Sequence, residues 1–441
     1  MLNKNSSWVN LAYILTGGLT VYIGYFVARE DTWLLLSLYT LLFASVAFII
    51  RQAKSEDVDL GYYWGILLRV LLIASLPKLS DDFYRFIWDG RLLLNFEDPY
   101  KYLPAHHLDQ GLTGITKTLY NQLNSPEYFT IYPPLNQVVF FISTLFSPGS
   151  IVWSVVIMRV IMIAFELGNI GLIRKLLRHY KLPQAYGLIY VLNPLVIFEV
   201  TGNLHFEGIM VYFLLLAIWQ YEQGKLHKSA IFFGLSVATK FLPLIFLPFL
   251  LRKIGLKKTF IYGLIVGGTL AVTFLPLINT AHIWAIKESM ELYFQKFEFN
   301  GSIYYLARWY GFETEGHNII AKSGKWMMYA TLVSIMIYSL LGKKKDWPRQ
   351  MVWVWTLYLL FATTVHPWYV IPLLAIAVFS NVRFPFLWSF LIFFTYANYL
   401  GGDYMDRIEV VIIEYSLVGI MALWEVFGGR ADKLFLRKGT S

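Results

Sequence analysis

The sequence predicts an all-α, polytopic membrane protein that forms a single domain over residues 1–441. Hydrophobic residues make up 57% of the chain and charged residues only 15%, whereas soluble proteins average about 25% charged residues. Apolar stretches of about 20 residues, the length of a membrane-crossing helix, recur from one end of the chain to the other. We therefore expect a bundle of about 12–14 transmembrane helices with outer-face loops and short interfacial helices.

Apolar stretches of helical length define the predicted spans. The first begins at Trp8, lacks a convincing small-residue cleavage site and is expected to remain as a span rather than to be removed as a signal peptide. In chain order, the predicted spans are 8–28, 32–51, 61–79, 151–173, 185–200, 206–221, 259–279, 326–342, 350–365, 369–381, 384–400 and 408–427.

Two apolar stretches do not fit a simple span. Residues 133–147 begin with Pro133-Pro134 and are too short to cross a hydrocarbon core of about 30 Å, so a surface or re-entrant helix is expected. Residues 229–251 are interrupted by Lys240 and Pro243, which predicts two half-helices with Lys240 at the break. A single span there would also move Lys343–Lys345 to the opposite face from the other basic loops.

Basic residues divide the loops between two faces. The net charge is +9, which can indicate nucleic-acid binding, but these charges lie in short loops between spans and are better explained by membrane topology. One set of loops, with Lys4, carries 22 of the 37 Lys and Arg residues and is assigned to the cytoplasm. The opposite face then carries an outer loop at about 80–132, a second at about 280–325 and a short segment, 401–407.

A run of acids and aromatic residues follows the third predicted span. Residues 80–91 read Ser-Asp-Asp-Phe-Tyr-Arg-Phe-Ile-Trp-Asp-Gly-Arg. A carboxylate beside a hydrophobic wall has a raised proton affinity and suits a general base, so Asp81 and Asp82 are the candidate catalytic residues. The alternative is a charged stop at a span end. At helical spacing, Asp81, Arg85 and Asp89 lie on one face, and Tyr84, Trp88 and Arg91 lie on another. Tyr84, Arg85 and Asp89 are the candidate sugar- or acceptor-binding residues of this run.

Further candidates lie at predicted span ends. His205 and Glu207 could hydrogen-bond sugar hydroxyls, or could belong to an ordinary hydrated connection. Lys240, beside a helix break, would bind phosphate or extend to the interface. Arg308 and His366 are further phosphate-binding candidates. Alternatively, Arg308 is a solvated loop arginine and His366 is a histidine in an aromatic belt at the membrane interface. Arg159 and Glu166 are expected to pair within the bundle as structural residues.

Missing residue types and motifs exclude several kinds of chemistry. Cysteine is absent, so disulfides, thiol nucleophiles and Cys-ligated metals are excluded. No Walker A loop, dinucleotide-binding glycine fingerprint or zinc-protease helix occurs, and we predict neither cofactor nor metal. An outward-facing enzyme would not meet cytosolic nucleotide sugars, which leaves a sugar carried on a lipid phosphate.

The sequence resembles the GT-C superfamily of glycosyltransferases, in particular the bacterial mannosyltransferase-like branch related to the GPI mannosyltransferase I family. The run 80–91, followed by Pro99-Tyr100, carries most of the resemblance. Ile131-Tyr132-Pro133-Pro134-Leu135, Asn193-Pro194, Lys240 with Pro243, and His366-Pro367-Trp368-Tyr369 agree in order, and Tyr132 is added to the candidate sugar- or acceptor-binding residues. Where that family has Asp-x-Asp, Asp81 falls on the first acid and Phe83 on the second.

The resemblance implies an inverting transfer of mannose from a polyprenyl-phosphate or dolichyl-phosphate donor to a lipid or glycan acceptor. Asp81 is favoured over Asp82 as the base, and Lys240, Arg308 and His366 would stabilise the leaving phosphate. Compact loops suit a bacterial inner membrane with the site facing the periplasm, among membrane lipids and without nucleic acid. The alternative function is a polytopic transporter or lipid-linked sugar flippase, because broken helices and buried charges occur there too.

Overall fold

The computed structural model describes residues 4–54, 56–275, 297–341, 347–402 and 404–428. Every regular element in these ranges is helical, apart from one isolated bridge between Phe299 and Thr364. Four helices are long and apolar enough to cross a membrane: α1(Lys4–Phe26), α2(Thr32–Gln52), α7(Ile151–His179) and α16(Ile320–Leu341). The predicted all-α, polytopic membrane fold is confirmed.

A fifth crossing arises if a bent pair of helical segments counts as one span. The segments Gln184–Val191 and Pro194–Gly202 meet at 48°. They separate at Asn193-Pro194, where the Asn193 side chain accepts a hydrogen bond from the Leu195 amide at 3.0 Å and Pro194 opens the next turn. Proline cannot extend the preceding helix, since it lacks an amide donor. The second segment ends in a π-helix, η3(Ile197–Gly202).

The other predicted spans also contain helices, most of them shorter than predicted, and the number of about 12–14 crossings stays a prediction. They are α3(Val58–Leu71), α10(Glu207–Glu222), α13(Leu256–Phe274), α17(Trp347–Phe361), α18(Val370–Ala377), α19(Phe384–Leu391), continued by η7(Ile392–Tyr399), and α20(Ile408–Val426).

The predicted break near Lys240 is present. The helix α11(Leu226–Thr239) ends there, Lys240 has extended backbone angles, and the chain continues through η4(Leu242–Phe246) into α12(Leu247–Ile254). Pro243 lies in the first turn of η4. The break thus places a lysine at the end of one helix and directly before the next.

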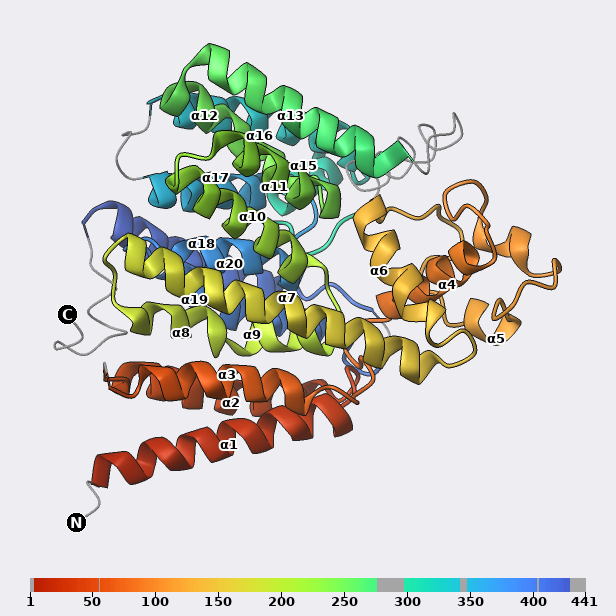
Figure 1. Cartoon of the computed structure of the whole chain (residues 1–441), viewed down its shortest axis with the longest axis horizontal. Helices are drawn as coiled ribbons and strands as arrows, with labels where there is room; N and C mark the ends of the chain where they lie inside the picture. Colours follow the sequence, from red (N-terminus) through yellow and green to blue (C-terminus); the bar gives the residue numbers. More distant parts are fainter. Residues whose placement is uncertain (1–3, 55, 276–296, 342–346, 403, 429–441) are drawn as a thin grey trace.

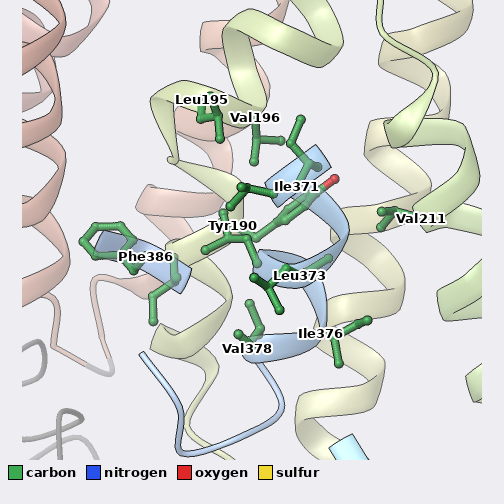
Figure 2. Packing of buried hydrophobic residues seen from close by; sticks show 14 of the residues in the cluster. Tyr190, Leu195, Val196, Val211, Ile371, Leu373, Ile376, Val378 and Phe386 are labelled. Atoms are coloured by element: carbon green, nitrogen blue, oxygen red, sulfur yellow. The ribbon is translucent and has the colours of Figure 1, made fainter. Parts of the chain in front are cut away.

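The core consists of two clusters of buried apolar side chains. The larger joins the long helices, and Figure 2 shows part of it, where Tyr190 packs among Val211, Ile371 and Phe386 from α10, α18 and α19. The smaller lies between α4(Asp82–Leu94), α6(Pro134–Leu145), α7 and the connecting loop. In Figure 1, α4, α5(Lys117–Tyr120) and α6 form a group at one end of the long helices.

A close approach between α4 and α6 holds this group together. A Cβ atom at Gly90 would lie 2.4 Å from the Phe140 carbonyl oxygen, so only glycine permits the contact. The loop between the helices is tied back to α4, since Arg91 donates to the Gly114 carbonyl at 2.7 Å and Asn95 to that of Thr113 at 3.0 Å. This group includes most of the predicted outer loop at about 80–132.

Some predictions lie wholly or partly outside the described residues. Residues 280–296 of the predicted second outer loop lie outside the described residues. So do several of the basic residues assigned to the cytoplasm: Lys343–Lys345, Arg430, Lys433, Arg437 and Lys438. Within the described part of the second loop, α15(Ser302–Glu315) carries Arg308.

Candidate active site

The two adjacent acids at the start of α4 have different surroundings. Asp81 precedes the helix and pairs with Arg29 at 3.0 Å, and its side chain is 43% exposed. The Asp82 side chain is 21% exposed, and its carboxylate accepts a hydrogen bond from Asn124 at 2.6 Å and has its second oxygen 3.9 Å from His205 Nδ1. Asp82 is therefore the acid that joins the other candidate residues.

Burial raises the pKa of the Asp82 carboxyl, an effect that the hydrogen bond from Asn124 and the charge of Lys240 partly offset. The neighbouring carboxylates of Asp81 and Glu207 raise this pKa further. A carboxylate with increased proton affinity is better able to take a proton from a hydroxyl group. The site thus gives Asp82 the electrostatic character of a general base.

His205 lies between two carboxylates. Its Nε2 is 3.4 Å from Glu199 in the π-helix, while Nδ1 faces Asp82. Its ring stacks on Trp368 with centroids 3.6 Å apart. Burial lowers the pKa of His205 well below its usual value, and the charge of Lys240 lowers it further, so the imidazole is neutral at pH 7.

Lys240 and Glu207 complete this cluster from the helix break. The Lys240 ammonium donates to the Glu207 carboxylate and lies 4.3 Å from the centroid of the Tyr369 ring. The Lys240 side chain remains 29% exposed, so its charge is accessible from one side. Three separate segments of the chain thus bring together Asp82, the neighbours His205 and Glu207, and Lys240.

His366 belongs to the same cluster through a column of aromatic rings. Its ring stacks on Trp368 at 4.5 Å and on Phe299 at 4.6 Å, and Trp368 stacks in turn on His205. Burial, with a smaller effect of Lys240, lowers the pKa of His366 to about 3. At neutral pH it can donate or accept a hydrogen bond but brings no positive charge.

Arg308 lies in a separate network. It pairs with Glu298 at 2.9 Å and with Asp406 at 2.7 Å, so two carboxylates already neutralise its guanidinium group. Neither carboxylate belongs to the cluster around Asp82. A phosphate-binding role for Arg308 stays a prediction, and it would require at least one of these pairs to open.

Among the remaining candidates, Arg85 and Asp89 are buried and pair with each other at 2.9 Å. Arg85 also donates to two carbonyl groups of the outer loop, at Ser125 and Tyr128, and Asp89 accepts from Gln137 at 3.0 Å. These contacts favour a role in holding the loop over α4.

Tyr84 and Tyr132 occupy different environments. The Tyr84 side chain is partly exposed, and its ring lies tilted against that of Phe83 with centroids 4.0 Å apart. The Tyr132 ring packs edge-on against Phe86 and Phe140, and its carbonyl accepts a hydrogen bond from Tyr100. Of the two, Tyr84 is the better placed to contact a bound sugar.

Arg159 holds the two segments that carry Asp82 and His205. It donates to the carbonyls of Thr201 and Gly202 at 2.7 and 2.9 Å, and to those of Ile73 and Ser75 in the segment before α4. The expected pair with Glu166 is wrong, since Glu166 pairs instead with Arg69 at 2.7 Å. Arg159 reaches four carbonyls because both segments end their helices beside it and leave these groups unsatisfied.

Sequence reasoning missed Glu199. It is fully buried, accepts hydrogen bonds from Tyr396 at 2.8 Å and Asn203 at 3.1 Å, and faces His205. It lies inside the predicted span 185–200, where an acid among apolar residues marks a functional candidate by default. Among the described residues, no group of three or more His, Asp or Glu side chains is arranged to hold a metal ion.

The helical membrane fold and a charged cluster around an acid at the start of α4 define the class as a GT-C-type membrane glycosyltransferase. A family model supports this class: residues 4–254 match alpha-(1->6)-mannopyranosyltransferase, N-terminal domain, of the MptA_B family. This match covers more than half of the chain, so the protein belongs to that family and is a glycosyltransferase of the mannosyltransferase type. No curated protein matches the chain.

Proposed function

We propose that the protein transfers mannose from a polyprenyl-phosphate donor to an acceptor hydroxyl group, forming an α-(1→6) linkage at the outer face of a bacterial inner membrane. The linkage comes from the name of the matched family. The observation that carries the proposal is the convergence of Asp82, His205 and Lys240 beside a helix break. A base and a phosphate-binding cation would then act from one partly exposed cluster.

In the proposed reaction, the Asp82 carboxylate takes the proton of the acceptor hydroxyl as its oxygen attacks the anomeric carbon. The bond from that carbon to the phosphate oxygen breaks on the opposite face, which inverts the configuration, and polyprenyl phosphate leaves with the electron pair. Lys240 stabilises the charge that grows on the phosphate. His205, neutral and stacked on Trp368, fixes the edge of the site beside Asp82.

The choice between the two acids differs from the sequence hypothesis, which favoured Asp81. Asp81 is paired with Arg29 and has the more exposed side chain of the two acids. Asp82 faces His205 and lies within the field of Lys240. These contacts support Asp82 as the base and Asp81 as a residue that anchors the start of α4.

The test compares Asp82→Asn with Asp81→Asn in purified protein given radiolabelled polyprenyl-phosphate mannose and a lipid extract. General-base catalysis contributes about 10²–10⁴-fold, so Asp82→Asn should lower the rate by that factor and Asp81→Asn by much less. The reverse order would assign the base to Asp81. Labelled donor that crosses vesicle membranes without transfer would instead support the transporter or flippase alternative.

A further inference from the structure

A second feature suited to a lipid lies at the other end of the bundle from Asp82. An apolar crevice with an open mouth runs between α10, α11, α12, α13 and α17. Its walls include Leu214, Ile218, Phe233, Phe246, Phe249 and Met351.

The crevice is separate from the candidate active site. Both touch α10, which begins at Glu207 beside Lys240, while the crevice is lined by residues of the same helix from Leu214 to Tyr221. At 1.5 Å per residue, Tyr221 lies about 21 Å along the helix from Glu207. A ligand at Lys253 therefore cannot be the phosphate held by Lys240.

One cation stands at the crevice. Lys253 is the one charged residue among the described residues that line it, and its ammonium lies 4.2 Å from the Trp347 ring centroid and 5.1 Å from that of Tyr221. No carboxylate of the described residues lies within ion-pair distance of it. The nearby acid, Glu222, is engaged by His179 at 3.2 Å and Tyr180 at 3.0 Å.

Most of the crevice wall is apolar. The Ser229 and Tyr262 hydroxyls bond to each other at 3.0 Å, and the other wall residues are mainly aliphatic or aromatic. Basic pockets between membrane helices bind anionic lipid head groups, and Trp and Tyr favour the same interfacial depth.

We propose that this crevice binds an anionic phospholipid of the surrounding bilayer, with an acyl chain between α10, α11 and α12 and the phosphate at Lys253. The charge of the crevice selects the head group: a single unpaired cation beside two aromatic rings matches a phosphate, and the apolar walls match a hydrocarbon chain. This site is independent of the transfer reaction and requires no particular assignment of the base.

Native mass spectrometry of the full-length, delipidated protein tests the proposal. Dioleoyl phosphatidylglycerol should bind, and Lys253→Met should weaken its binding about tenfold, while Lys253→Arg retains it. Lys257→Met removes an exposed lysine from the neighbouring α13 and is the matched control. Ala217→Leu, which fills part of the crevice, should reduce binding without removing the cation.

Equal binding of phosphatidylglycerol to wild type, Lys253→Met and Ala217→Leu would overturn the proposal. So would tighter, Lys253-dependent binding of farnesyl phosphate, because the crevice would then serve a prenyl phosphate and not a phospholipid. Size-exclusion elution of each variant checks its fold. If Ala217→Leu does not fold, the test rests on Lys253→Met, because the Lys253 side chain is partly exposed and its replacement leaves the packing intact.

Discussion

At the scale of single residues, the stacked histidines link the stability of the site to pH. His205 and His366 have pKa values lowered by burial, that of His366 to about 3. In the unfolded chain both would titrate near pH 6.5. The unfolded state therefore binds more protons below pH 6.5, and the free energy of unfolding falls as the pH drops through that value towards 3.

We expect the Tm of the wild-type protein to fall between pH 7.5 and 5.5, and the fall to be smaller in a His205→Gln/His366→Gln double variant. Thermal unfolding followed by scanning fluorimetry at both pH values measures the difference. His227→Gln changes a histidine at an exposed position and serves as the control. Equal pH dependence in the wild type and the double variant would contradict a neutral, buried pair.

Several site residues could be predicted because they are polar groups beside apolar stretches. Asp82, His205, Glu207, Lys240 and His366 all belonged to the sequence-based candidates, and the structure places them in one cluster. The contact of Arg308 with Asp406 joins positions 98 residues apart in the chain and could not be read from spacing. Glu199 was missed because its apolar neighbours made it read as part of a span.

At the scale of elements, the contact between α4 and α6 depends on a glycine. Gly90→Ala places a Cβ atom within 2.4 Å of backbone at Phe140, so the helices must separate. Overpacking of this kind costs about 1–3 kcal/mol, and a lower Tm is expected. Gly171→Ala in α7, where a Cβ atom meets nothing within 4 Å, is the matched control and should leave the Tm unchanged or raise it.

The same substitution separates stability from catalysis. Asp82 starts α4, so a shift of that helix moves its carboxylate away from His205 and should also lower the transfer rate of Gly90→Ala. Unchanged Tm together with unchanged activity would show that α4 and α6 can move apart freely.

Helix breaks were easier to predict than helix lengths. Proline and the residue before it restrict the backbone locally, so the breaks at Asn193-Pro194 and near Lys240-Pro243 follow from the sequence alone. The helices α3 and α18 end at Leu71 and Ala377, inside the predicted spans 61–79 and 369–381, because hydropathy carries no signal for the residue at which a helix ends.

At the scale of the whole molecule, the absence of cysteine makes the predicted topology directly testable. Single-cysteine variants report the side of the membrane on which a position is labelled, without background from native thiols. We expect Asp109→Cys, in the loop near α4, and Lys257→Cys, near the lipid crevice, to react with an impermeant maleimide from opposite sides of oriented vesicles. Labelling of both from one side would contradict the proposed outer-face site.

Composition and hydropathy were enough to predict an all-α membrane fold, because these properties are summed over the whole chain. The grouping of α4, α5 and α6 at one end of the long helices was not predictable, since it depends on Gly90 fitting against one carbonyl of α6 and on Arg91 and Asn95 fastening the loop (Figure 1). The single domain over 1–441 and its outer-loop boundaries stay predictions.

The ring column formed by His205, Trp368, His366 and Phe299 has a mechanical consequence. Offset stacking of planar rings is favourable, so each ring of the column supports the next. The Phe299 amide donates to the Thr363 carbonyl at 3.1 Å, and the Val365 amide donates to the Phe299 carbonyl at 2.7 Å. Backbone bonds thus anchor the end of the column, which gives the candidate site a rigid edge on the side of His205.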